Sequence, residues 1–167
     1  MPTKKAIERA KQDRREGKSA STQAGEFVRE EIEHVREGKH GARSTKQAIA
    51  IGLSEARRAG VKLPPPKKGK ASRKTVKRAE RDLEAGRQKT RRPSAKRSRA
   101  TTRALKREGH SAASKKALAK HARKAARKRS AAERSASARK AARTKGVQGR
   151  SAAARKAART RARSHKR

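Results

Sequence analysis

The stretch "STKQAIAIGLSEARRAG" occupies residues 44–60 and is the most apolar part of a 167-residue chain with a formal net charge of +40. Ser44 precedes the apolar residues and Gln47 follows three positions later, which is the spacing of a capping box at a helix start. Gly60 suits the end of a helix, where glycine tolerates the left-handed conformation. The stretch therefore predicts a helix over about residues 45–59.

A second helix is predicted over residues 23–37, and both predicted helices carry an apolar stripe at helical spacing. We expect the two stripes to bury each other in a helical hairpin, because each buried apolar side chain stabilises a fold by roughly 1.5–3 kcal/mol. The predicted packing nucleus consists of Phe27, Ile32, Val35, Ile49 and Leu53.

Large apolar side chains are scarce in the rest of the chain. Leu, Ile, Val and Phe total 15 residues, and the chain has one Phe, no Tyr and no Trp. Chains with less than about 20% of these residue types and a high net charge are typically disordered. The predicted fold class is mostly α, with a small helical mini-domain at the N-terminus, a proline linker, and isolated or partly disordered basic Ala-rich helices.

Charge and proline divide the sequence. Residues 1–63 hold 15 Lys and Arg against 9 Asp and Glu, whereas residues 64–167 hold 39 against 5, and "VKLPPPKKGK" lies between them at 61–70. Three consecutive prolines favour an extended, semi-rigid segment. The expected domains are a helical module at 1–61, a Pro/Lys linker at 62–71, a degenerate basic copy of the module at 72–130, and a basic repeat tail at 131–167.

Five glycines follow runs of helix-forming residues and suit left-handed C-caps. They predict further helices over residues 3–16, 72–85 and 96–108. The glycines are Gly17, Gly38, Gly60, Gly86 and Gly109.

Two kinds of repeat occur. Residues 4–18 align with 73–87, and residues 36–58 align with 107–128, which indicates a degenerate duplication. In the tail, "ARKAAR" occurs at 122–127, 138–143 and 154–159 with a period of 16 residues. On a helix this hexapeptide places its cations on one side and alanines on the other.

The cationic faces of these repeats are the predicted nucleic-acid-binding residues. Double-stranded DNA carries about one charge per 1.7 Å, and cations gain affinity for it by releasing counterions. We expect the tail to be disordered alone and helical when bound. The residues are Arg123, Lys124, Arg127, Lys128, Arg139, Lys140, Arg143, Arg155, Lys156 and Arg159.

The predicted function is non-specific, electrostatic binding of nucleic acid, with double-stranded DNA favoured, as in histone-like or nucleoid-associated proteins. A ribosome-associated or other RNA-binding role is an alternative, because charge alone does not separate the two duplexes. A second alternative makes residues 24–60 a protein-interaction module and the tail a localisation device. A membrane partner is not expected, since the apolar side of the tail is almost all alanine.

Catalysis, cofactors and metals are not expected. The chain has no cysteine, which excludes disulfides, thiolate catalysis and Cys-based zinc sites. Its five histidines are scattered without metal-ligand spacing, and solvent exposure is expected for all of them: His34, His40, His110, His121 and His165.

Residues 24–60, with "VREGKHGARS" followed by "KQAIAIGLSEARRAG", resemble a family of small basic bacterial proteins of unknown function. The pattern of that family has alanine where this chain has Gly52, and the resemblance implies no catalytic residues. The tail at 90–167 is similar to the Lys/Arg/Ala-rich tails of linker histones and bacterial histone-like proteins, which implies DNA compaction. The N-terminus lacks the apolar region of a secretory signal. The expected location is therefore the bacterial cytoplasm and nucleoid.

Overall fold

Seven α-helices and one short 3₁₀ helix form over the part of the chain that the structure, a computed structural model, describes: residues 2–67, 69–88 and 94–165. Those residues include no strand, so the prediction of a mostly α fold is confirmed. The helices are α1 (Lys4–Arg15), α2 (Ala20–Arg36), α3 (Thr45–Arg58), α4 (Arg73–Arg87), α5 (Ala95–Lys106), η1 (Ser111–Ala113), α6 (Lys115–Arg127) and α7 (Ala131–His165).

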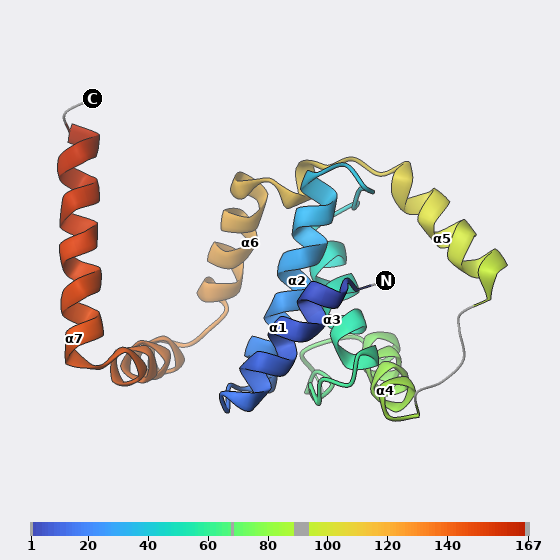
Figure 1. Cartoon of the computed structure of the whole chain (residues 1–167), viewed down its shortest axis with the longest axis horizontal. Coiled ribbons are helices and arrows are strands. Elements are labelled where there is room, and N and C mark those ends of the chain that lie inside the picture. The colour runs from blue at the N-terminus through green and yellow to red at the C-terminus, as the bar shows by residue number, and fades with distance from the viewer. Residues whose placement is uncertain (1, 68, 89–93, 166–167) are drawn as a thin grey trace. The chain divides into compact units, whose positions relative to one another are not determined.

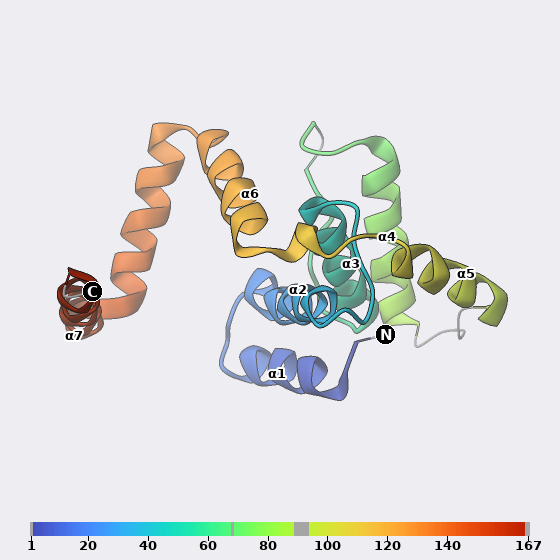
Figure 2. The same cartoon turned by 90° about the horizontal axis from the view of Figure 1, so that it is seen from above.

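Internal contacts divide the chain into a first unit, residues 1–121, and a second unit, residues 122–167. In the first unit, α2 packs between α1 and α3, and α4 packs on α3 (Figures 1 and 2). The predicted hairpin of α2 and α3 is confirmed and forms the centre of this unit.

Serine or threonine hydroxyl groups cap the N-termini of most of the helices in the described residues. Ser44 Oγ accepts a hydrogen bond from the amide of Gln47 at 3.3 Å, as predicted. The reciprocal half of the expected capping box differs, because the Gln47 side chain accepts from the amide of Arg43 at 3.0 Å. Equivalent hydroxyl caps, which sequence analysis did not identify, start other helices: Thr3, Ser19, Ser72, Ser114 and Ser130.

The contact between α2 and α3 is made by small residues. Ala48 and Ala56 are fully buried on α3, and Gly52 lies between them at the same helical spacing. A Cβ atom on Gly52 would lie 2.6 Å from Val28 Cα and 3.0 Å from the Phe27 carbonyl oxygen. The two helix backbones therefore approach more closely than any residue larger than glycine allows at this position.

The predicted packing nucleus is correct in part. Phe27 and Val35 are the largest fully buried side chains of the described residues. Leu53 and Ile32 are half-buried at the edges of two separate apolar clusters, and Ile49 is half-buried outside both. Ile49 and Leu53 are thus less buried than Ala48 and Gly52, because the small residues one position away allow the closer helix approach.

The segment between α5 and α6 packs on the α2–α3 corner. The amides of Gly41 and Ala42 donate to the carbonyls of Leu105 and Gly109 at 2.9 and 3.0 Å. Ala112 and Ala113 are buried in the same cluster as Val35. Residues 36–45 and 107–114, which the sequence aligns as copies, thus lie against each other.

Helix α4 is held to α3 by one polar cluster and one close backbone contact. Ser54 Oγ donates to Asp82 at 2.5 Å, and Arg58 forms an ion pair with the same carboxylate at 3.3 Å. A Cβ on Gly86 would lie 2.1 Å from the carbonyl oxygen of Arg57. The expected boundary at 62–71 therefore falls inside the first unit, because α4 and residues 105–113 pack back on the N-terminal helices.

The expected glycine C-caps are confirmed at Gly17, Gly38 and Gly60, whose φ angles are 69°, 74° and 93°. The same expectation was wrong for Gly86 and Gly109, which do not have positive φ. Gly86 is inside α4, where its lack of a side chain serves the contact with α3.

Helix α7 bends at Gly146, whose φ of 63° and ψ of 179° lie outside the helical region. Residues 131–145 and 147–165 are helical on either side of it. The tail is thus helical in the structure, where disorder in the absence of nucleic acid was expected. Alanine is the strongest helix former, and its abundance here offsets the repulsion between neighbouring cations.

We predict that Gly52→Ala destabilises the protein although alanine is the better helix former. The new methyl group meets the backbone of α2, and overpacking of this kind costs about 1–3 kcal/mol, against a helix-propensity gain of about 1 kcal/mol. Gly25→Ala is the matched control, because nothing lies within 4 Å of its Cβ position. Thermal unfolding should show a lower Tm for Gly52→Ala and a higher one for Gly25→Ala. Equal gains for both variants would contradict the close contact.

We predict that Gly146→Ala straightens α7, because alanine strongly disfavours the backbone angles of the bend. Dyes on Ala132→Cys and Ser164→Cys measure this by energy transfer in a chain that has no other cysteine. A straight helix separates these backbone positions by about 48 Å, and the bent wild-type helix brings them closer. Gly149→Ala raises helix propensity away from the bend and should leave the distance unchanged. A wild-type distance already at the straight-helix value would refute the bend.

Candidate nucleic-acid interface

All ten cations predicted to bind nucleic acid are exposed and lie in the second unit. The first three are at the end of α6, Lys128 follows that helix, and the other six are divided between the two halves of α7. Lys128 is in the turn just after α6, so the face predicted there is helical for three of its four cations.

Each "ARKAAR" copy on α7 has the same local geometry. Its three cations occupy positions i, i+1 and i+4, which fall within an arc of about 100° on a helix. Thr144 Oγ1 donates to the carbonyl of Lys140, and Thr160 Oγ1 donates to that of Lys156, both at 3.0 Å. The 16-residue repeat is therefore a repeat of structure as well as of sequence.

The bend at Gly146 changes the direction in which the cationic faces of the two α7 repeats point relative to each other. Sixteen residues of straight helix rotate a side chain by about 160°, so a straight α7 would point the two cationic faces in nearly opposite directions. The bend breaks this relation. A hollow at the bend is lined by Arg139, Arg143 and Arg150 together with Ala142, Gly146 and Val147. Arg150 was not among the predicted residues, since it lies outside the repeated hexapeptide.

Carboxylates are nearly absent from the second unit, which has 18 Lys and Arg against one Glu, a net charge of +17. That residue, Glu133, accepts a hydrogen bond from the amide of Ser130 at 2.9 Å at the start of α7. A carboxylate at a helix N-terminus complements the helix dipole.

Carboxylates of the first unit are paired within that unit. Glu26 forms ion pairs with Arg9 and Arg29, and Glu33 pairs with Arg29, at 3.6–3.7 Å. Lys18 bridges Asp13 and Glu16 at 2.7 Å. All of these ion pairs join residues of the first unit. The sequence alone did not identify partners for these carboxylates of α1 and α2.

The expectation that all five histidines are exposed was wrong for His34 and His40, which are half-buried. The loop after α2 folds back and places His40 Nε2 3.5 Å from Glu31. His121 is also half-buried, whereas His110 is exposed, and the side chain of His165 lies outside the described residues.

None of the helices in the described residues combines the length and the apolar character needed to cross a lipid bilayer.

Comparison with protein-family models matches the N-terminal part of the chain. Residues 3–68 are similar to a family of unknown function (DUF6496). This match covers α1, α2, α3 and most of the proline-rich segment, and it includes the region 24–60 whose resemblance to an uncharacterised family the sequence suggested. No curated protein and no solved structure matches the chain.

Proposed function

We propose that the second unit binds double-helical nucleic acid, with double-stranded DNA as the preferred target, through the phosphate backbone and without reading base sequence. The observation that carries this proposal is the excess of 18 exposed or terminal cations over one carboxylate in 46 residues. A solvated protein surface normally mixes both signs of charge, and a single-sign field of this size attracts a polyanion.

The spacing of the cations suits a duplex. A 16-residue helical repeat is about 24 Å long, and the phosphates of a duplex along that length carry about 14 charges. Two repeats would contact on the order of eight to ten phosphates and release a similar number of counterions. Base readout is not part of the proposal, because specific readout needs a few side chains held rigidly at groove edges.

The apolar content of the second unit argues for a nucleic acid rather than a lipid surface. Among the described residues of the second unit, Val147 is a large apolar side chain exposed to solvent. The other apolar side chains of α7 are alanines. Interfacial helices insert Trp, Phe or Leu, which this segment lacks. A role in compacting DNA, as in histone-like nucleoid proteins, is consistent with backbone binding of this kind.

We predict a steep dependence of duplex affinity on salt. With eight to ten phosphate contacts, the association constant should fall about 10³–10⁵-fold between 50 and 200 mM salt. Fluorescence anisotropy with a labelled DNA duplex measures this for the full chain and for a chain lacking residues 122–167. The truncated chain should lose most of the affinity, and it should lose the helical signal of α7 while keeping the cooperative thermal unfolding of the first unit. The variant Leu53→Asp should unfold the hairpin and bind nearly as well as wild type.

An affinity independent of salt, or a truncation without effect, would contradict the proposal. The same titration with double-stranded RNA of equal length decides between the two duplexes. If the protein binds double-stranded RNA more tightly than double-stranded DNA at equal salt, RNA is the target and the proposed preference for DNA is wrong.

We predict that the two α7 repeats contribute equally. Replacing three cations by glutamine should reduce the magnitude of the slope of log K against log salt by about 2.7 in either repeat, because each phosphate contact contributes about 0.9. One variant carries Arg139→Gln, Lys140→Gln and Arg143→Gln, and the other carries Arg155→Gln, Lys156→Gln and Arg159→Gln. Ala141→Gln is the control that keeps the charge. A loss confined to one repeat would indicate a local site instead of distributed charge.

A further inference from the structure

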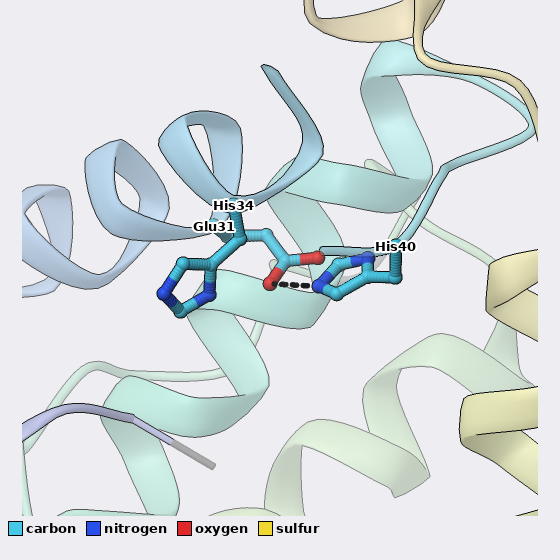
Figure 3. A group of neighbouring side chains, drawn as sticks. All are labelled: Glu31, His34 and His40. Atoms are coloured by element: carbon cyan, nitrogen blue, oxygen red, sulfur yellow. Dashed lines mark ion pairs between the residues drawn. The ribbon is translucent and has the colours of Figure 1, made fainter. Parts of the chain in front are cut away.

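Three side chains with metal-ligand chemistry meet beside the α2–α3 corner. Glu31 and His34 lie on one face of α2 at i and i+3, and His40 comes from the loop that follows (Figure 3). One ligand atom from each lies within 4.8 Å of the other two. In Figure 3 the carboxylate of Glu31 lies between the two imidazole rings.

The backbone fixes the position of His40. Gly38, with a φ of 74°, reverses the chain after α2 and returns the loop towards that helix. The next residues are held from the other side, because the amides of Gly41 and Ala42 donate to carbonyls of the segment 105–109. The cluster is thus built by three parts of the chain: a helix, a turn, and a segment almost seventy residues further on.

Glu31 is the unusual member of the cluster. It is 2% exposed, and its Oε1 atom has no hydrogen-bond partner among the described residues. A buried carboxylate oxygen without a partner is costly, and in a native protein such an atom is satisfied by a bound water, a proton or an ion.

The hydrogen bond of His40 determines which ring nitrogen is available. His40 Nδ1 lies 3.2 Å from the carbonyl oxygen of Gly41, which can only accept, so Nδ1 carries the hydrogen. In the neutral ring Nε2 then presents a lone pair to Glu31 Oε2 at 3.5 Å. A proton or a metal cation between these two atoms would satisfy both of them. A histidine whose other nitrogen donates to a carbonyl is the usual arrangement in metal sites.

We propose that Glu31, His34 and His40 bind one divalent transition-metal cation of the zinc class. Two imidazoles and one carboxylate are ligands that Zn²⁺ accepts, and hard cations such as Mg²⁺ prefer all-oxygen sites. Held by both carboxylate oxygens, the cation would also give the buried Glu31 Oε1 atom a partner. This site is separate from the cationic helices proposed to bind nucleic acid.

The distances suit zinc after a small adjustment. Ligand atoms about 2.0–2.1 Å from a tetrahedral zinc are separated from each other by about 3.4 Å. The pair of Glu31 Oε2 and His40 Nε2, at 3.5 Å, already has this spacing. The remaining separations are at most 4.8 Å and would close by up to about 1.4 Å, which side-chain rotations supply.

A bound cation would tie α2 to its loop. Because the loop is also bonded to residues 105–109, metal binding would stabilise the docking of that segment on the module. The expected effect is an increase in the thermal stability of the first unit, since a ligand that binds the folded state alone shifts unfolding to higher temperature.

The test uses the full, untagged chain, stripped with a chelator and titrated with Co²⁺ and with Zn²⁺. Wild type should bind one Co²⁺ with visible d–d absorption, Zn²⁺ should displace it, and Zn²⁺ should raise the Tm reversibly. Glu31→Gln and His40→Ala should each lower the affinity more than about 100-fold, beyond the roughly 10–100-fold cost of losing an outer partner of a ligand. His121→Ala is the matched control and should bind as wild type does.

Circular dichroism of each metal-free variant checks that it folds. If a variant unfolds, the wild-type spectrum and Tm shift still decide. A wild type whose Tm is unmoved by Zn²⁺ and that shows no Co²⁺ spectrum overturns the proposal and leaves a Glu31–His40 ion pair. Affinities that fall equally in His121→Ala and His40→Ala also overturn it.

Discussion

The contact of α2 with α3 at Gly52 is the constraint on which the first unit depends. The chain has too few large apolar side chains to fill a conventional core, and its two apolar clusters are built mainly from alanine. Small side chains bury little area each, so they stabilise a fold when backbones come close enough for many dispersion contacts. Gly52 permits that approach.

Close backbone contact recurs where later segments dock. A Cβ on Gly41 would lie 1.8 Å from the carbonyl of Glu108, and Gly86 meets α3 in the same way. These positions join α4 and residues 105–113 to the N-terminal helices and extend the folded unit to residue 121. The strongly cationic part of the chain therefore follows a folded unit in which several carboxylates of α1 and α2 already form local ion pairs.

Local signals in the sequence predicted local structure well. Ser44, the apolar spacing after it, and the glycines at 17, 38 and 60 predicted the first helices and their ends, because caps and periodicity act within a few residues. The packing nucleus was predicted in part, since hydrophobicity favoured Ile49 and Leu53, whereas the close backbone approach buries Ala48 and Gly52. Proline at 64–66 predicted an extended segment, but composition could not show that α4 returns to α3.

The Glu31–His34–His40 cluster was missed for a similar reason. His34 and His40 are six residues apart, which does not place them on one helix face, and the turn at Gly38 brings them together. The exposure of the α7 cations was predicted correctly, because the exposure of charged side chains does not depend on tertiary contacts. Their arrangement around the bend was not predicted, since it depends on a single backbone conformation at Gly146.

Hydrogen exchange of the full chain, with and without a DNA duplex, tests the account most directly. The slowest amides should be those of α2 and α3 around Val28 and Gly52, because they lie at the closest contact, and DNA should not change them. Added protection should be confined to residues 122–165. Rapid exchange in α2 and α3, or DNA-dependent protection centred on the first unit, would contradict the account.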